Sequence, residues 1–257
     1  MKIMYTLRAI SLTIILCNSI TRPNVTYSII DSESPILITP ESERIGHTWH
    51  EGTVWEKHLI EKFYRILKSL PKDCTVLDLG AQTGCFSLLA KYFPDSLWHS
   101  FEPVAEVADE LRKNLALNGI TNVMVHQYAA TDYTGSITLH MPAMNAWGLC
   151  TIGSNVQRFE ELVSRTVNCI DLDSFLSESK IKKVDLIKID TEGAELSILK
   201  GAKNIIQMYH PIILMEYNQV NMSQCNARPE DIDSFLISMG YVWELVSTED
   251  ILCYYKQ

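Results

Sequence analysis

The chain has 257 residues, of which 47% are hydrophobic and 21% are charged, and its net charge is −9. A chain of this size can bury one substantial core, so one domain is the simplest expectation. The acidic balance disfavours nucleic acid as the main partner, because a phosphate backbone is bound by clustered Lys and Arg. The sequence contains no internal repeat, low-complexity run or block of like charge, which argues against a disordered tail.

The N-terminal residues are open to two interpretations. Lys2 and Arg8 precede an apolar stretch from Ala9 to Cys17, which is far shorter than the roughly 20 residues of a membrane span. The stretch is typical of the hydrophobic core of a signal peptide, and its β-branched residues equally favour a first strand. A signal peptide places the protein in the secretory pathway, whereas a strand places it in the cytoplasm. Membrane contact is expected only through this segment.

From residue 29 the chain alternates between extended and helical patterns. A hairpin is expected from 29–30 and 36–38, and a second one from 241–246 and 251–255 at the end of the chain. Between them, strands are expected at 75–77, 97–101, 122–126, 184–189 and 212–215, and helices at 55–70, 86–93, 104–118, around 198–206 and at 228–239. This alternation predicts βαβ units and a doubly wound, mostly parallel α/β sheet. Ligands of such sheets bind beyond the carboxyl ends of the strands.

The first of these strand ends is a glycine-containing turn. Asp78 closes the strand, and Gly80 and Gly84 flank Ala81, Gln82 and Thr83. The glycines allow a tight turn and a close approach of a ligand, and the N–H groups of the following helix suit a carboxylate. Asp78 is placed to hold a cation such as an ammonium group. A turn of this kind is a weak signal by itself.

The second strand end strengthens the signal. Glu102 and Pro103 follow Phe101, about 20 positions after Gly80, where an acidic residue accepts hydrogen bonds from the ribose hydroxyls of an adenosine. The alternative is that Glu102 only caps the next helix. The spacing from Gly80 to Gly84 lacks the middle glycine that a dinucleotide needs, and a carboxylate at position 78 would repel a pyrophosphate. The pattern therefore favours S-adenosylmethionine over NAD.

These motifs together resemble one family. Residues 76–84 (VLDLGAQTG), 101–103 (FEP), 187–195 (IKIDTEGAE), 199–202 (LKGA) and 215–216 (ME) look like the FkbM-type S-adenosylmethionine-dependent methyltransferases. The block at 187–195 is the specific one, and Gln82 departs from the family's more common asparagine. The resemblance covers residues 46–257, which we assign to the methyltransferase domain, with residues 1–45 as an N-terminal segment. It implies a class I, Rossmann-like methyltransferase fold, in which the terminal hairpin supplies a reversed strand.

The resemblance also implies the site. The expected cofactor contacts are Asp78, Gly80, Ala81, Gln82, Gly84, Glu102, Pro103, Ala130, Asp190 and Glu192. Asp190 is expected beside the sulfonium and the acceptor, whereas Glu195 is expected only to stabilise the start of a helix. Asp190 and Glu216 are the candidates for the general base. These two with Asn218 could instead bind a divalent metal through oxygens, an alternative that we rank lower.

Other features bear on the acceptor. His47, His50, His126, His140 and His210 are further candidate bases, and Trp147 lies in a long insert, 141–164, expected on the acceptor side. Family members methylate hydroxyls of sugars or polyketides, which implies a small-molecule or glycan acceptor and O-methylation. Two other classes stay open, an NAD-linked oxidoreductase and an inactive cofactor-binding module of the same fold.

Two further signals define no site. The seven cysteines are odd in number and form no Cys-x-x-Cys pair, so we expect packed thiols and neither a zinc site nor a disulfide framework. The triplets at Asn24 and Asn221 match the N-glycosylation pattern, which often arises by chance.

Overall fold

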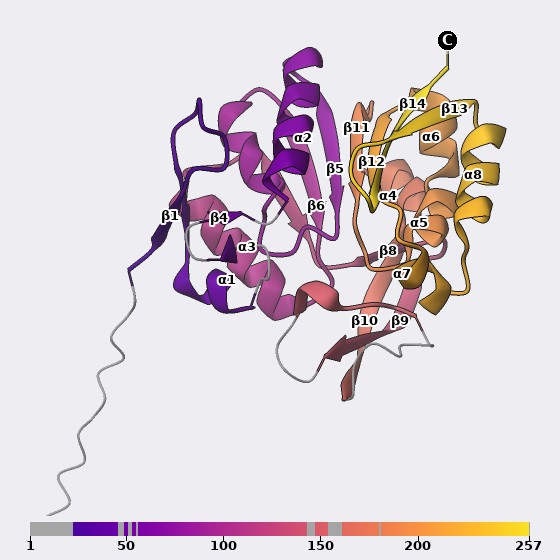
Figure 1. The fold of residues 1–257 in the computed structure, drawn as a ribbon, viewed down its shortest axis with the longest axis horizontal. Helices are drawn as coiled ribbons and strands as arrows, with labels where there is room; N and C mark the ends of the chain where they lie inside the picture. Colours follow the sequence, from indigo (N-terminus) through magenta and orange to yellow (C-terminus); the bar gives the residue numbers. More distant parts are fainter. Residues whose placement is uncertain are drawn as a thin grey trace, which may run out of the picture.

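A seven-stranded sheet forms the centre of the molecule (Figure 1). The computed structural model describes residues 23–45, 49–50, 53–54, 56–142, 147–153, 161–179 and 181–256. The strand order is β13 (Tyr241–Leu245), β14 (Asp250–Tyr255), β12 (Ile212–Glu216), β11 (Leu186–Ile189), β5 (Thr75–Leu79), β6 (Leu97–Phe101) and β7 (Val123–His126). Neighbours from β12 to β7 are parallel, and β14 runs antiparallel to both of its neighbours. The expected doubly wound sheet with a reversed strand from the terminal hairpin is confirmed.

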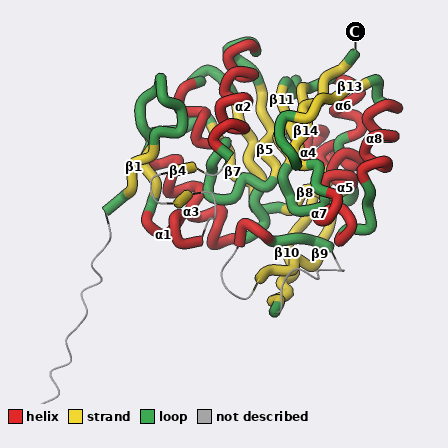
Figure 2. The backbone as a smooth tube through the Cα atoms, viewed as in Figure 1, coloured by secondary structure: helices red, strands yellow, loops and turns green. Residues whose placement is uncertain are grey.

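Helices cover both faces of this sheet (Figure 2). One face packs against α2 (Lys57–Ser69), the 3₁₀ helix η1 (Ser87–Tyr92) and α3 (Ala105–Leu117). The other face packs against α4 (Leu172–Glu178), α5 (Glu195–Gly201), α6 (Lys203–Tyr209) and α8 (Pro229–Ser238). Because helices cover both faces of the sheet, β5 and β11 are buried along their whole length. Strands in this position therefore need apolar residues at successive positions.

A smaller, separate sheet was not predicted. Its order is β8 (Ala129–Thr131), β10 (Leu162–Asp171) and β9 (Gly135–Pro142), and β9 and β10 project from the body of the molecule (Figure 1). The two long strands pair antiparallel from Gly135 with Cys169 to Pro142 with Leu162. The expected insert at 141–164 therefore begins and ends inside paired strands. The polar, outward-facing residues of β10 hide this pairing in the sequence, because an exposed strand lacks a strong apolar pattern.

Three predicted elements differ in detail, and one of them is the helix expected around 198–206, which is divided at Ala202 into α5 and α6. The first strand of the N-terminal hairpin is β1 (Val25–Tyr27), paired with β2 (Ile36–Ile38), and the predicted strand at 29–30 is wrong. Ile29 and Ile30 lie in the connection yet are buried, so their apolar character reflects the core rather than a strand. The predicted helix at 86–93 is the short 3₁₀ helix η1.

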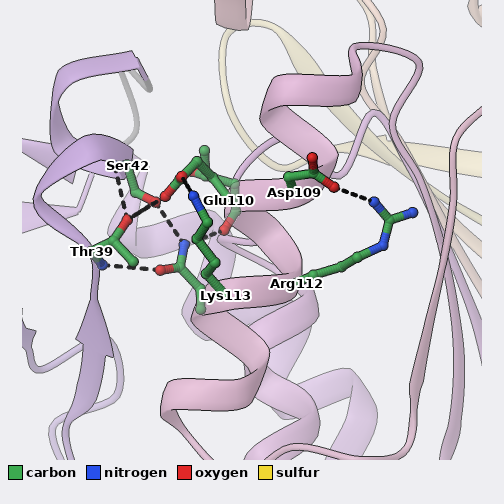
Figure 3. Close-up of polar contacts among 8 residues, drawn as sticks. Thr39, Ser42, Asp109, Glu110, Arg112 and Lys113 are labelled. Carbon is green, nitrogen blue, oxygen red and sulfur yellow. Dashed lines mark hydrogen bonds and ion pairs between the residues drawn. The ribbon is translucent and has the colours of Figure 1, made fainter.

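The N-terminal segment is attached to α3 by polar contacts (Figure 3). The Thr39 hydroxyl donates to Glu110 Oε2 at 2.6 Å, and the Thr39 N–H donates to the side-chain oxygen of the fully buried Asn114 at 3.0 Å. The Asn114 amide donates in turn to Ser42 Oγ and to the Thr83 carbonyl, both at 2.8 Å. Thr83 belongs to the glycine-containing turn, so one buried amide joins the segment, the helix and that turn.

The remaining described elements are short. They are α1 (Pro40–Ile45), β3 (Trp49–His50), β4 (Thr53–Val54), η2 (Trp147–Leu149) and α7 (Gln219–Gln224). No helix in the described part of the chain is long and apolar enough to cross a membrane. The two interpretations of the N-terminus concern residues outside the described ranges. The division at residues 45 and 46 stays a prediction, although Tyr27, Ile36 and Ile38 share the core with α2 and α3.

Candidate active site at the carboxyl ends of the strands

A cavity lies where the chain order of the sheet reverses, between β5 and β11. It is lined from the sheet by residues at the ends of β5, β6 and β11, and from the other side by the small sheet and the segment 147–153. Its lining residues are Gly80, Gln82, Phe101, Glu102, Pro103, Tyr128, Ala129, Ala130, Leu139, Gly148, Cys150, Ile152, Asp190, Thr191, Glu192 and Ala194. This is the position at which a doubly wound sheet binds its ligand.

Gly80 is required by the close approach of β5 and β11. Its φ is +78°, and a Cβ there would lie 1.9 Å from the backbone oxygen of Asp190. Gly84, with φ +107°, has a different reason, because a Cβ there would lie 2.5 Å from the Leu111 side chain on α3. Gly80 thus shapes the cavity, whereas Gly84 lets the turn pack against α3 and does not line the cavity.

Glu102 sits at the end of β6 and is 7% exposed. Its Oε2 accepts the Gln82 N–H at 3.1 Å, and its Oε1 accepts the Val104 N–H at 2.9 Å. Burial raises the pKa of Glu102 to about 7, and the two N–H donors oppose that rise. The helix-start interpretation is therefore partly correct, because Val104 precedes α3. Each carboxylate oxygen accepts more than one hydrogen bond, so these contacts leave acceptor capacity at the cavity.

Lys188 was missed in the sequence and is the central cation of the site. It stands opposite Asp78 in the register of β11 and β5, and its side chain is 5% exposed. Its Nζ lies 3.4 Å from Asp190 Oδ2, 3.8 Å from Asp78 Oδ1 and 3.2 Å from the Gly80 carbonyl. Burial lowers the pKa of Lys188, but the two carboxylates outweigh burial and raise it.

Asp78 does not line the cavity. It is fully buried, and its Oδ2 accepts the Ser87 hydroxyl at 2.5 Å. The ammonium group that this carboxylate meets in the structure is that of Lys188. Burial raises the pKa of Asp78, and Lys188 opposes that rise. Asp190 differs, because its side chain is 39% exposed and lines the cavity.

Two more carboxyls lie beside Asp190 at this edge of the sheet. Glu216 ends β12, and burial, followed by the charges of Asp190, Glu195 and Glu192, raises its pKa to about 11. Glu56 precedes α2, and burial, followed by Asp250 and Asp190, raises its pKa to about 7. Glu216 is therefore protonated at neutral pH, which makes it a poor general base.

Glu192 and Glu195 occupy the turn after β11 in different ways. Glu192 lines the cavity in a left-handed conformation, with φ 60°. Glu195 is fully buried, and its Oε1 accepts the Thr191 N–H at 3.1 Å, the Thr191 hydroxyl at 2.9 Å and the Gly193 N–H at 3.3 Å. These contacts fit the expected role of Glu195 in stabilising the start of α5.

The segment 147–153 closes the cavity on the side of the small sheet. A Cβ on Gly148 would lie 2.4 Å from Gln82 Nε2, so the two lie in close contact. Thr151 pairs with His140 of β9, and its hydroxyl donates to the Glu192 carbonyl at 2.7 Å. Cys150 and Ile152 line the cavity, a role that no local pattern in the sequence indicates. The side chain of Trp147 lies outside the described residues.

Most of the expected cofactor residues meet at the cavity. Gly80, Gln82, Glu102, Pro103, Ala130, Asp190 and Glu192 line it, whereas Asp78, Ala81, Gly84 and Glu216 do not. Their individual roles stay predictions. Sequence reasoning missed Lys188 and, on the small sheet, Ala129 and Leu139.

The candidate histidine bases are less well placed. His126 stacks on His99 and packs against Phe101 and Phe175, and burial lowers its pKa to about 4. His210 stacks on Tyr255, and His140 contacts Ser164 on β10. His47 and the side chain of His50 lie outside the described residues. Among the described residues, no group of three or more His, Cys, Asp or Glu side chains is arranged to hold a metal ion.

Comparison with known proteins identifies the family. The chain is 27% identical over 158 residues to Methyltransferase 1 of Beauveria bassiana, covering 55% of this chain and 63% of that protein. It is 23% identical over 149 residues to the hexuronic acid methyltransferase AglP of Haloferax volcanii, covering 58% of each. The chain thus spans about three fifths of the length of these relatives.

Matches to solved structures are partial. One is a methyltransferase FkbM from Methylobacillus flagellatus, with a TM-score of 0.48 and 17% identity over 72% of this chain and 44% of that chain. The family model described as Methyltransferase FkbM domain matches residues 78–243, which is more than half of the chain. The chain belongs to the FkbM methyltransferase domain family.

Proposed function

We propose that this chain is an S-adenosylmethionine-dependent methyltransferase that methylates a hydroxyl group of a sugar, a glycan or a secondary metabolite. The observation that carries the proposal is Asp190, a partly exposed carboxylate that lines the same cavity as Glu102 at the reversal point of the sheet. One carboxylate suits the ribose of the cofactor and the other suits its sulfonium and the acceptor hydroxyl.

The residues at the cavity fit this cofactor. Glu102 keeps acceptor capacity for the ribose hydroxyls while the Gln82 and Val104 N–H groups hold it in place. Gly80 brings the backbone close to the ligand position, where a side chain would clash. Asp78 contributes through Lys188, whose ammonium group connects it to Asp190.

The reaction needs placement and a proton acceptor. Bound S-adenosylmethionine supplies an electrophilic methyl group on a positively charged sulfur. The methyl group would pass to the acceptor oxygen, the sulfur would keep the electron pair of the broken carbon–sulfur bond, and the hydroxyl would lose its proton. We assign the hydroxyl proton to Asp190, which Lys188 positions at 3.4 Å. Glu216 is less suited to take that proton, because its raised pKa keeps it protonated.

The two other classes are distinguished by ligand binding. An NAD-linked oxidoreductase would bind NAD and not S-adenosylhomocysteine, and membership of a methyltransferase family disfavours it. An inactive module would bind the cofactor without turnover. A metal-dependent variant of the proposed reaction would lose activity with a chelator and regain it with magnesium.

The cofactor is tested by thermal unfolding and calorimetry with S-adenosylhomocysteine. The ligand should raise the melting temperature, because it binds only the folded state. Glu102→Ala should weaken binding by roughly 1.5–3 kcal/mol, the value of hydrogen bonds to a charged acceptor. An unchanged dissociation constant in Glu102→Ala would remove the ribose assignment.

The chemistry is tested with methyl-labelled cofactor and a panel of glycans and small hydroxyl compounds. Asp190→Asn keeps the size of the side chain and removes its basicity, so turnover should fall about a hundredfold or more. Cofactor affinity should change much less. Asp109→Asn, on the exposed side of α3, is the matched control. Near-normal turnover in Asp190→Asn would show that this carboxylate is not the base.

A further inference from the structure

Asn221 joins the ends of two neighbouring strands of the central sheet. It lies on α7 and is 5% exposed. Its Nδ2 donates to Glu192 Oε2 at 2.8 Å and to Glu216 Oε1 at 2.6 Å. Glu192 follows β11 and Glu216 ends β12, so one amide nitrogen contacts carboxyls from both strands.

The turn after β11, which carries Glu192, is held by hydrogen bonds from Thr151 and Asn221. The Glu192 residue adopts φ 60°, a conformation that costs a non-glycine residue free energy and persists only when its surroundings impose it. Its carbonyl accepts the Thr151 hydroxyl at 2.7 Å, while its carboxylate accepts the Asn221 amide. Asn218 caps α7 and accepts the Asn221 N–H at 3.2 Å, which fixes the position of the bridging residue.

We propose that Asn221 is a positioning residue of the methyl-transfer site, and that its amide holds the Glu192 and Glu216 carboxyls side by side. The turn 190–193, which carries the cavity residues after β11, is thereby fixed in its shape. This inference rests on the proposed function. An amide suits the task because it donates two hydrogens from one nitrogen and carries no charge. An aspartate has the same shape, but when ionised it would donate no hydrogen to either carboxyl and would repel the Glu192 carboxylate.

The bridge also explains a motif that the sequence left open. The triplet Asn221-Met222-Ser223 matches the glycosylation pattern, and a glycan would be attached at Nδ2. In the folded protein Asn221 is buried, and its Nδ2 donates to both carboxyls. A glycan on Nδ2 would replace one of those hydrogens and break the bridge. The triplet is therefore part of the site's support and not an acceptor in the folded chain.

The test compares Asn221→Asp with wild type at about pH 5.5 and about pH 8. A buried carboxyl beside two others has a raised pKa, so at the lower pH it is protonated and can donate one hydrogen bond. At the higher pH it is ionised, so it donates no hydrogen bond and repels the Glu192 carboxylate. The dissociation constant for S-adenosylhomocysteine should rise about tenfold or more at the higher pH and by about threefold or less at the lower pH. Asn168→Asp, which adds the same charge on the exposed side of β10, is the control and should leave binding unchanged.

A second variant separates positioning from general damage to the fold. Combining Asn221→Asp with Glu192→Gln exchanges the amide and the carboxylate, so the hydrogen bond can form again with reversed polarity. Because Glu192 lines the cavity, the reference is the single variant Glu192→Gln, and binding by the double variant at about pH 8 should return to within a few-fold of that variant. Equal binding by Asn221→Asp and wild type at both pH values would overturn the proposal. So would a loss that neither low pH nor the second substitution relieves.

Failure of the proposed function gives a different result. A wild-type protein that binds no S-adenosylhomocysteine overturns the cofactor assignment. Melting temperatures of the same variants then decide the role of Asn221. The deficit of Asn221→Asp should grow from about pH 5.5 to about pH 8 and shrink in the double variant, and a deficit independent of both overturns the bridge.

Discussion

Replacing Glu216 by glutamine should stabilise the protein at neutral and alkaline pH. Glu216 ends β12, its Oε1 accepts the Asn221 amide, and its Oε2 is buried without a hydrogen-bond partner among the described residues. Burial and three neighbouring carboxylates raise its pKa from 4.5 to about 11. A glutamine has the shape and the neutral charge of the protonated acid, and its side-chain oxygen can accept the same hydrogen bond.

The size of the expected gain in stability follows from the proton that Glu216 takes up when the chain folds. The unfolded chain loses this proton above about pH 4.5, whereas the folded protein keeps it, so wild-type stability falls as pH rises toward the folded pKa. Each pH unit in that window costs about 1.4 kcal/mol, which amounts to roughly 3 kcal/mol at pH 7. Glutamine does not titrate, so Glu216→Gln should match wild type near pH 4.5. At pH 7 its melting temperature should be higher by roughly 6–12 °C.

The measurement is thermal unfolding of both proteins from about pH 4.5 to about pH 9. Glu244→Gln, a half-exposed residue of the edge strand β13, is the matched control and should follow the wild-type curve. Methyl transfer should survive in Glu216→Gln, since we assign the proton to Asp190. Parallel stability curves for Glu216→Gln and wild type would refute the assigned protonation. A collapse of turnover with intact cofactor binding would return Glu216 to the role of base.

Three other substitutions probe the support of the site. Gly80→Ala should lower the free energy of unfolding, measured in urea, by roughly 3 kcal/mol or more, because the new Cβ would meet the Asp190 carbonyl and the φ of this residue is positive. An almost unchanged stability would contradict the close approach of β5 and β11. Lys188→Met should lower the free energy of unfolding by about 3–5 kcal/mol at neutral pH, because it removes the cation beside the buried Asp78 carboxylate. Low pH should reduce this loss of stability, and a loss that does not depend on pH would argue against the charge pair. Asn118→Ala removes side-chain hydrogen bonds of 2.9 and 2.7 Å to the backbone of β2, so limited proteolysis should release the N-terminal segment faster. An unchanged rate would show that the other contacts of the segment hold it without this pair.

Local sequence patterns determined the central sheet and one side of the cavity. Gly80, Glu102 and Asp190 each follow an apolar run directly, and parallel strands place such ends at one edge of the sheet. The reversed terminal hairpin could be predicted for the same reason, because two short apolar strands around a polar turn form a local unit. These features can be predicted because each depends only on residues that are close together in the chain.

Tertiary structure decided the partners of those residues. Lys188 lies within a buried strand and contacts the Gly80 carbonyl 108 positions away, a pairing set by the register of β11 on β5. The small sheet supplies Ala129 and Leu139 to the cavity, but its two long strands have many exposed residues and carry no strong apolar pattern. Asn221 looked like a glycosylation acceptor, and only the packing of α7 against two strand ends shows that it bridges two carboxyls. Hydrogen bonds between distant segments depend on the folded geometry, and therefore the sequence alone predicts the ends of the strands but not what those ends contact.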